Sequence, residues 1–225
     1  MMNMAAEFPS PEKYDKNAIV TVPRYSEFHN EAVNVVKNFG IKPRIWLDTG
    51  CGTAKLVYDH IDEFPDTEFV LSDPTRGMID IAKDRMRGNE KCSYVIKATD
   101  ELMFGDESVD VITAILCHHY YDEGGRRKAE QNCYRMLKKG GIYVTVEHTA
   151  PATEEGFTIT RARWKEMLVK AGRTEEEAED HLARYNCSFF PITIEAHIRQ
   201  LKDCGFSIVE PFIMSYFQVG FYAIK

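Results

Sequence analysis

The chain has 225 residues, of which 44% are hydrophobic and 28% charged, and its formal net charge at pH 7 is −7. This composition is typical of a globular protein with one buried core, and no apolar run reaches the roughly 20 residues that a membrane-spanning helix needs. The net negative charge argues against nucleic-acid binding, which relies on clustered lysine and arginine.

Six cysteines are spread along the chain without CxxC spacing. Scattered thiols are typical of a reduced, cytoplasmic protein rather than of a disulfide framework or a zinc site. Residues 1–12 contain no basic segment followed by an apolar block, so we expect no secretory signal. We therefore expect a cytoplasmic protein with no membrane partner. The sequence leaves open whether the protein forms a homodimer.

An amphipathic segment precedes the main pattern of the chain. Apolar residues recur at helical spacing from Ser26 to Phe39, and Gly40 ends this predicted helix. Three prolines lie before the helix, at positions 9, 11 and 23. We therefore treat residues 1–40 as a separate N-terminal helical segment.

From Ile45 onward, short apolar strands alternate with helices. Strands are predicted over 45–47, 68–72, 93–97, 109–116 and 142–147, and helices after Thr53 and over 75–87 and 125–138. The strand over 109–116 is apolar throughout, as a central parallel strand is. Strands alternating with helices of this length imply right-handed crossovers and a parallel, doubly wound sheet.

Residues 151–193 break this alternation, because they are helical and highly charged. We interpret them as a helical cap inserted after the fifth strand, and the acidic run Glu175 to Asp180 as a solvated helix start. A helix over 194–204 and two strands over 207–212 and 216–224 follow, and the short link lets these strands pair antiparallel. The expected fold is α/β: a Rossmann-like, doubly wound sheet of seven strands, mostly parallel, formed by residues 41–150 and 194–225.

The first predicted strand ends in the glycine turn Asp48-Thr49-Gly50-Cys51-Gly52. Ligands of an open parallel sheet bind outside the carboxyl ends of its strands, and glycines let the backbone turn sharply and approach a ligand. An ordinary tight turn stays open for so short a motif. The second strand runs into Asp73, whose carboxylate can accept both hydroxyls of a ribose. Alternatively, Asp73 begins the turn with Pro74 or caps the next helix.

A nucleotide cofactor without a pyrophosphate fits this pattern. A dinucleotide site normally has a third glycine where this chain has Lys55, whose bulk disfavours a nicotinamide oxidoreductase. After the third strand, Asp100 is placed to accept from an adenine amino group. A glycine turn, a ribose acid and an adenine acid therefore follow one another on successive strand ends.

These residues resemble the class I S-adenosylmethionine-dependent methyltransferases. Residues 45–53 are similar to that family's first motif, the segment 116–119 is similar to its cofactor-lining segment, and 137–143 to the stretch leading into the fifth strand. The resemblance covers roughly residues 40–150 and 194–225. It implies an enzyme that uses S-adenosylmethionine, releases S-adenosylhomocysteine and methylates a small-molecule acceptor. The cofactor-binding residues expected on this basis are Tyr25, Asp48, Gly50, Cys51, Gly52, Asp73, Pro74, Met78, Asp100, Glu101 and Cys117.

Residues 22–26 resemble the N-terminal segment of the carboxy-S-adenosylmethionine synthase family, in which this tyrosine reaches over the cofactor. The resemblance implies that Tyr25 and residues 1–40 form a lid, the alternative being a helix packed on the sheet. Two features depart from that family: the glycine turn has the ordinary methyltransferase form, and the arginine for the extra carboxylate falls at Gln200, with Arg199 adjacent. Synthase activity and a non-catalytic cofactor-binding module are therefore alternative functions.

A general base is needed only when the methyl acceptor carries a proton that must leave. We expect one histidine of the pair His118-His119 to pack locally and the other to face the pocket, and Glu147 or His148 to contact the substrate. Cys117, His118 and His119 predict no metal site, because adjacent residues of an extended segment point in alternating directions. In the cap, the side chains suited to an anionic or aromatic acceptor are Arg161, Arg163 and Trp164, which surface and core packing explain equally well.

Overall fold

The computed structural model describes residues 11–225 and contains a mixed sheet with the strand order β3-β2-β1-β4-β5-β8-β7, with β6 beside β5. Strands β1 to β5 run parallel, and β8 runs antiparallel between β5 and β7. The strands are β1 Ile45–Thr49, β2 Glu68–Ser72, β3 Cys92–Val95, β4 Val109–Ile115, β5 Leu137–Ala150, β6 Ile192–Thr193, β7 Ile208–Ser215 and β8 Gln218–Ile224. The predicted Rossmann-like sheet is confirmed, and the two-residue β6 is an addition to it.

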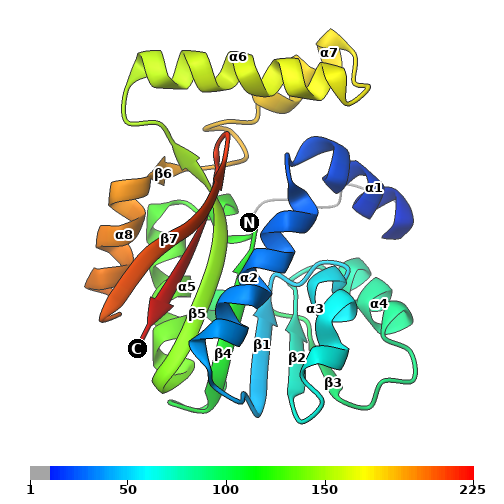
Figure 1. Ribbon diagram of the computed structural model, residues 1–225, viewed down its shortest axis with the longest axis vertical. Helices are drawn as coiled ribbons and strands as arrows, with labels where there is room; N and C mark the ends of the chain where they lie inside the picture. The colour runs from blue at the N-terminus through cyan, green and yellow to red at the C-terminus, as the bar shows by residue number, and fades with distance from the viewer. Residues whose placement is uncertain (1–10) are drawn as a thin grey trace.

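Helices cover both faces of the sheet (Figure 1). The α-helices are α1 Pro11–Thr21, α2 Tyr25–Phe39, α3 Lys55–His60, α4 Arg76–Arg85, α5 Glu123–Met136, α6 Glu154–Lys170, α7 Glu175–Leu182 and α8 Ile194–Asp203. Three short 3-10 helices, η1 Ile61–Glu63, η2 Thr99–Glu101 and η3 His118–Tyr120, lie between them. One buried core joins α2, α3 and α4 to the sheet, and a second joins α5 and α8 to its other face. Burial of apolar side chains on both faces holds the strand ends in fixed positions.

The fifth strand is longer than the sequence predicts. We expected the preceding helix to reach residue 138, but α5 ends at Met136 because Leu137 already pairs with Val109 of β4. Gly141 lies so close to the neighbouring strand that a Cβ there would stand 2.9 Å from the Asp110 carbonyl oxygen. The segment 137–141 is therefore the first part of β5, with a register shift opposite 109–111, rather than a helix end.

Helices α6 and α7 lie across the carboxyl ends of the strands (Figure 1). Their own small core consists of Trp164, Leu168, Ala178 and Leu182 packed on Phe217 of the β7–β8 turn. The acidic run begins α7, where the side chains of Thr174 and Glu177 form a reciprocal capping box, as expected of a helix start. The cap therefore has a core of its own and closes the end of the sheet where ligands are expected.

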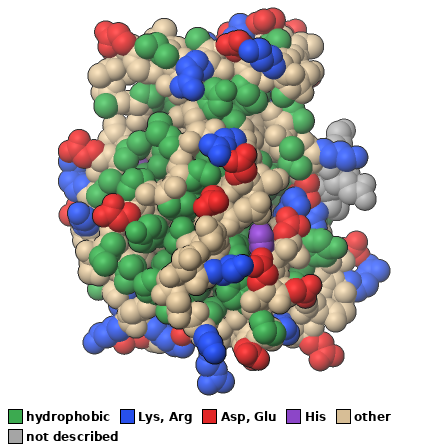
Figure 2. Space-filling view, viewed as in Figure 1, with side chains coloured by type: hydrophobic (Ala, Val, Ile, Leu, Met, Phe, Trp, Pro, Cys, Tyr) green, Lys and Arg blue, Asp and Glu red, His purple; other side chains and the backbone are tan. Residues whose placement is uncertain are grey.

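The face in Figure 2 carries acidic and basic side chains interspersed with hydrophobic ones. Over the described residues 11–225, no helix is long and apolar enough to cross a membrane.

Candidate active site

A cavity of about 1230 Å³ opens where β1, β2 and β4 end. Its walls come from the loops after these strands, from η2 and η3, from α1 and the start of α2, and from the end of the cap. Pockets for one small ligand usually measure about 300–1,000 Å³. This cavity therefore has room for more than one small ligand.

The glycine turn after β1 forms one side of the cavity. Gly50 has φ +64°, and a Cβ there would stand 2.4 Å from the Cys117 Cβ, so only glycine fits. Gly52 has φ +53° and open space where a Cβ would project. The turn therefore brings bare backbone to the cavity wall, and Lys55 extends beside it to pair with Asp59 (Nζ–Oδ2 2.7 Å).

Two aspartates from neighbouring strands face the same cavity. Asp48 is buried and accepts a hydrogen bond from Thr113 Oγ1 at 2.6 Å, and burial raises its pKa to about 7. Asp73 Oδ1 accepts from the Thr75 amide at 2.8 Å, and Oδ2 accepts from the Gly52 amide at 3.1 Å. The predicted turn at Asp73 is thus present. Since a carboxylate offers about four acceptor positions, Asp73 also keeps capacity for a ligand.

The third acidic group comes from η2. Asp100 Oδ1 accepts a hydrogen bond from the Tyr121 hydroxyl at 2.8 Å, and Tyr121 itself lines the cavity. Sequence reasoning missed this tyrosine, because its place depends on η3 folding back toward η2. All eleven residues expected to bind the cofactor line this one cavity: Tyr25, Asp48, Gly50, Cys51, Gly52, Asp73, Pro74, Met78, Asp100, Glu101 and Cys117.

His118 and His119 have different environments, although both are buried and both line the cavity. The Thr99 hydroxyl lies 2.9 Å from His118 Nε2, and the Tyr143 hydroxyl lies 3.0 Å from its Nδ1. Burial lowers the pKa of His118 to about 4. With both ring nitrogens engaged, His118 has none left to receive a substrate proton.

His119 is held through one nitrogen only. Its Nδ1 lies 3.2 Å from Glu147 Oε2 and 3.5 Å from the His148 backbone nitrogen, and Glu147 Oε1 accepts from Thr145 Oγ1 at 2.6 Å. Burial and the nearby charges of Arg126 and Arg184 hold the pKa of His119 well below its usual value. Because the contact with the Glu147 carboxyl group is shorter than the contact with the His148 amide, we assign the proton of neutral His119 to Nδ1, which then donates to Glu147 and leaves the Nε2 lone pair free.

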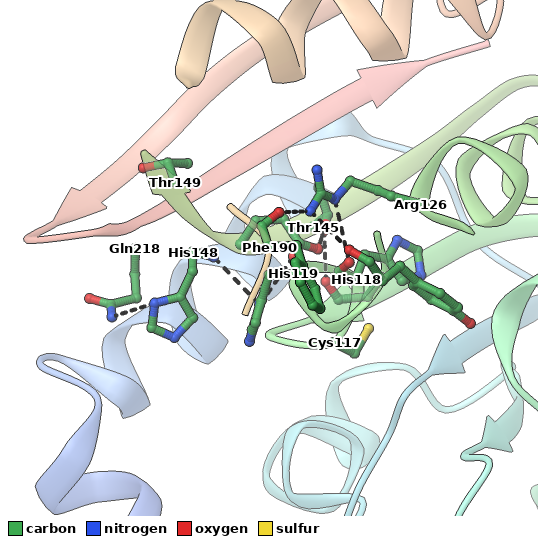
Figure 3. Close-up of polar contacts among 12 residues, drawn as sticks. Cys117, His118, His119, Arg126, Thr145, His148, Thr149, Phe190 and Gln218 are labelled. Carbon is green, nitrogen blue, oxygen red and sulfur yellow. Dashed lines mark hydrogen bonds and ion pairs between the residues drawn. The ribbon is translucent and has the colours of Figure 1, made fainter. Parts of the chain in front are cut away.

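We expect Glu147 or His148 to contact the substrate, and of the two Glu147 does not line the cavity. Successive side chains of a strand point to opposite faces, and at this end of β5 it is His148 that reaches the cavity. His148 Nδ1 lies 3.3 Å from the Gln218 amide nitrogen (Figure 3), and the His148 ring stacks on Phe189 at 4.8 Å. Glu147 therefore reaches the cavity only through His119.

A buried arginine connects this region to the cap. Arg126 Nε donates to the His118 carbonyl at 3.4 Å, and its Nη2 donates to the carbonyls of Tyr121 and Phe190 (Figure 3). One side chain of α5 thereby fixes η3 and the last turn of the cap together. The arrangement positions His119 beside Phe189.

Helix α1 covers part of the cavity, and polar contacts join it to the sheet helices on one side and to the cap on the other. Asp15 accepts from Thr53 Oγ1 at 2.7 Å and forms an ion pair with Arg85 of α4. Toward the cap, the Thr21 carbonyl accepts from Trp164 Nε1 at 3.2 Å. From Tyr14 to the end of α1, four residues line the cavity, namely Tyr14, Asn17, Ala18 and Thr21.

The cap side chains singled out in the sequence lie outside the cavity. Arg161 pairs with Glu179, Trp164 is buried in the cap core, and the Arg163 guanidinium lies 5.0 Å from the Tyr216 ring centre. The cap residues that do line the cavity are His181, Arg184, Phe189 and Phe190. His181 lies near the end of α7, and the other three lie in the turn after it, whose course no periodicity predicts.

Gln200, the position of the arginine expected for an extra carboxylate, also lies outside the cavity. Its amide donates to Glu130 Oε2 at 2.6 Å beneath α5 and α8. The adjacent Arg199 does not line the cavity either. Among the described residues, no group of three or more histidine, cysteine or carboxylate side chains is placed to hold a metal ion.

The chain is similar to known methyltransferases. A family model described as a methyltransferase domain matches residues 47–141. A ubiquinone/menaquinone biosynthesis C-methyltransferase of Vibrio parahaemolyticus is 30% identical over 130 residues, which are 56% of this chain and 49% of the relative. The chain thus spans about half the length of that relative.

Two further comparisons cover nearly all of the chain. A carboxy-S-adenosyl-L-methionine synthase of Staphylococcus epidermidis is 22% identical over 95% of this chain and 92% of the relative. A solved SAM-dependent methyltransferase of Aquifex aeolicus superposes with a TM-score of 0.62 at 17% identity, over 96% of this chain and 99% of the other. At that identity the superposition shows a shared fold.

Proposed function

We propose that the chain is an S-adenosylmethionine-dependent methyltransferase that transfers a methyl group from this cofactor to a small-molecule acceptor; the methyltransferase-domain model that matches residues 47–141 and the methyltransferase relatives support this. The observation that carries the proposal is the single cavity lined both by the strand-end acids and by His119 and His148. Its volume of about 1230 Å³ accommodates a cofactor and an acceptor together.

The residues around the glycine turn fit the cofactor. We assign the ribose hydroxyls to Asp73 and the adenine amino group to Asp100, and the exposed backbone at Gly52 permits close approach. The bound cofactor supplies an already activated sulfonium methyl group. Helix α1 then serves as a lid, with Tyr25 at the start of α2 beside it, because α1 lines the cavity and is bonded on both sides.

His119 is the group we assign as general base. Its neutral ring can take a proton from an acceptor hydroxyl, amine or thiol at Nε2 while Nδ1 keeps its hydrogen bond to Glu147. Glu147 fixes the tautomer and stabilises the imidazolium that forms, so it is a positioning residue. The cavity walls exclude water and hold the acceptor near the methyl group, which supplies much of the rate enhancement.

Ligand-induced stabilisation tests the cofactor assignment. S-adenosylhomocysteine at about 100 times its Kd stabilises the folded state by about 2.7 kcal/mol, which raises Tm by about 5–10 °C for a chain of this size. Asp73→Asn is expected to remove most of this shift. Asp84→Asn, on the exposed face of α4 outside the cavity, is the matched control and keeps it. No shift with the wild-type protein contradicts the proposal.

The carboxy-S-adenosylmethionine synthase reaction is the second candidate, favoured by the relative that covers 95% of the chain. The position of Gln200, bonded to Glu130 outside the cavity, argues against it. Incubation with prephenate and S-adenosylmethionine, followed by mass spectrometry of the cofactor, separates the two reactions. A carboxylated cofactor supports the synthase, and transfer of label from methyl-labelled cofactor to a panel of small molecules supports the methyltransferase. Tight cofactor binding with neither product indicates a non-catalytic binding module.

A further inference from the structure

The cavity has two chemically different halves. The half at the ends of β1 to β3 carries the carboxylates Asp48, Asp73, Asp100 and Glu101. The half beneath the cap is lined by rings, namely Tyr14, His119, Tyr120, His148, His181, Phe189 and Phe190. Arg184 is the charged side chain that lines this aromatic half. Because the first half fits the cofactor, the aromatic half is where the acceptor belongs.

Among the side chains from residue 14 to 225, the Arg184 guanidinium forms no ion pair with a carboxylate; its hydrogen-bond partner there is the Tyr120 hydroxyl, which burial keeps uncharged. Its carbon lies 4.4 Å from the Phe189 ring centre, a cation–π contact that orients the side chain without neutralising it. Arg161 and Arg85, by contrast, each form an ion pair with a carboxylate. An unneutralised guanidinium in a concave aromatic site attracts a carboxylate or phosphate, which its planar fork binds through two hydrogen bonds.

The positive charge of Arg184 shifts the pKa of several ionisable groups in the aromatic half. It lowers the pKa of His119, His148 and His181, and it opposes the rise that burial causes at Tyr14 and Tyr120. The guanidinium is therefore close enough to all of these side chains for its charge to act on them.

Phe189 connects Arg184 to the assigned base. The Phe189 ring centre lies 4.4 Å from the guanidinium carbon and 5.4 Å from the centre of the His119 ring. The sum of these two distances, about 10 Å, is an upper limit for the separation of Arg184 and His119. One small molecule is long enough to contact both groups while its ring lies in the aromatic half of the cavity.

We propose that Arg184 binds the oxyanion of an aromatic acid acceptor, whose ring packs in the aromatic half of the cavity and whose nucleophile faces His119. This inference rests on the proposed methyltransferase function and specifies its substrate class. Carboxylate and phosphate share the chemistry that Arg184 recognises, and the experiment below distinguishes them.

Binding of paired probes to the S-adenosylhomocysteine complex tests this assignment. Calorimetric titrations compare benzoate, 4-hydroxybenzoate and phenylacetate with their primary amides, and phenyl phosphate with phenol. We expect at least one oxyanion to bind more tightly than its neutral partner. Arg184→Gln should weaken that oxyanion about 10- to 100-fold, as loss of a charge-assisted contact does, and leave the neutral partner within about twofold. The class of the preferred probe, carboxylate or phosphate, identifies the oxyanion.

Arg163→Gln is the matched control, because Arg163 is also an exposed cap arginine stacked on a ring but lies outside the cavity. It should change no affinity. S-adenosylhomocysteine is titrated alone with each variant, so failure of cofactor binding in the wild-type protein counts against the methyltransferase function itself. If the wild-type complex prefers no oxyanion over its neutral partner, or if Arg184→Gln keeps the preference, the inference is overturned. Loss of S-adenosylhomocysteine binding in Arg184→Gln also overturns it, because the arginine would then serve the cofactor.

Discussion

Replacing Gly50 by alanine should destabilise the protein through two separable effects. At φ +64° an L-residue costs about 1–2 kcal/mol. The new Cβ would also stand 2.4 Å from Cys117 Cβ and 2.7 Å from its Sγ, and overpacking of this kind typically costs about 1–3 kcal/mol. The expected loss is therefore about 2–5 kcal/mol. Gly40→Ala, at φ +81° with nothing within 4 Å of the new Cβ, should lose only the first part.

Equilibrium urea unfolding of both variants measures the two losses, and a double-mutant cycle isolates the clash. In Cys117→Gly the nearest Cys117 atom to the new Cβ is the Cα at 3.9 Å, an ordinary contact. Gly50→Ala should therefore cost at least about 1 kcal/mol less in the Cys117→Gly background than in the wild-type protein. Equal losses for Gly50→Ala and Gly40→Ala, or additive effects in the cycle, would refute the close approach of β1 and β4 at the cavity wall.

Three further predictions address buried charge, the lid and the base. Burial raises the pKa of Glu130 from 4.5 to about 8, so the folded state holds a proton that the unfolded state releases, and stability should fall as pH rises through this window. Relative to Glu130→Gln, urea unfolding should show the wild-type protein losing up to about 1.4 kcal/mol per pH unit; a constant difference contradicts the raised pKa. Arg85→Gln, which removes the ion pair to Asp15, should speed amide exchange of residues 11–21 in hydrogen-exchange mass spectrometry, and unchanged protection there would show that the pair does not hold α1. Nitrogen-15 NMR at pH 7 should find His119 neutral with its proton on Nδ1; an imidazolium, or a proton on Nε2, excludes it as the base.

The order of strands and helices followed from hydrophobic periodicity, because each element buries one face and the parallel crossovers leave few topologies. Element boundaries that depend on pairing with a neighbouring strand could not be predicted from this periodicity. Residues 137–141 read as a helix end, yet Leu137 pairs with Val109 and begins β5. The short β6 forms only because the chain leaving the cap passes beside Thr149 and Ala150.

The half of the cavity at the strand ends could be predicted from the sequence, because strand-end residues of a parallel sheet meet at one edge whatever the course of the loops. Asp48, Asp73 and Asp100 illustrate this. The aromatic half could not be predicted, because Arg184 and Phe189 lie in an irregular turn that is bonded through Phe190 to Arg126, far away in the chain. Pairing of Glu147 with His119 likewise depends on the fold of η3.

In the proposed function, one cavity holds the cofactor at the strand ends, with the sulfur and its methyl group facing the aromatic half. A crystal structure with S-adenosylhomocysteine tests it most directly. We predict the ribose hydroxyls on the Asp73 carboxylate, the adenine beside Asp100, and the sulfur facing His119. A cofactor bound outside this cavity, or one whose sulfur points away from His119 and Arg184, would contradict the account.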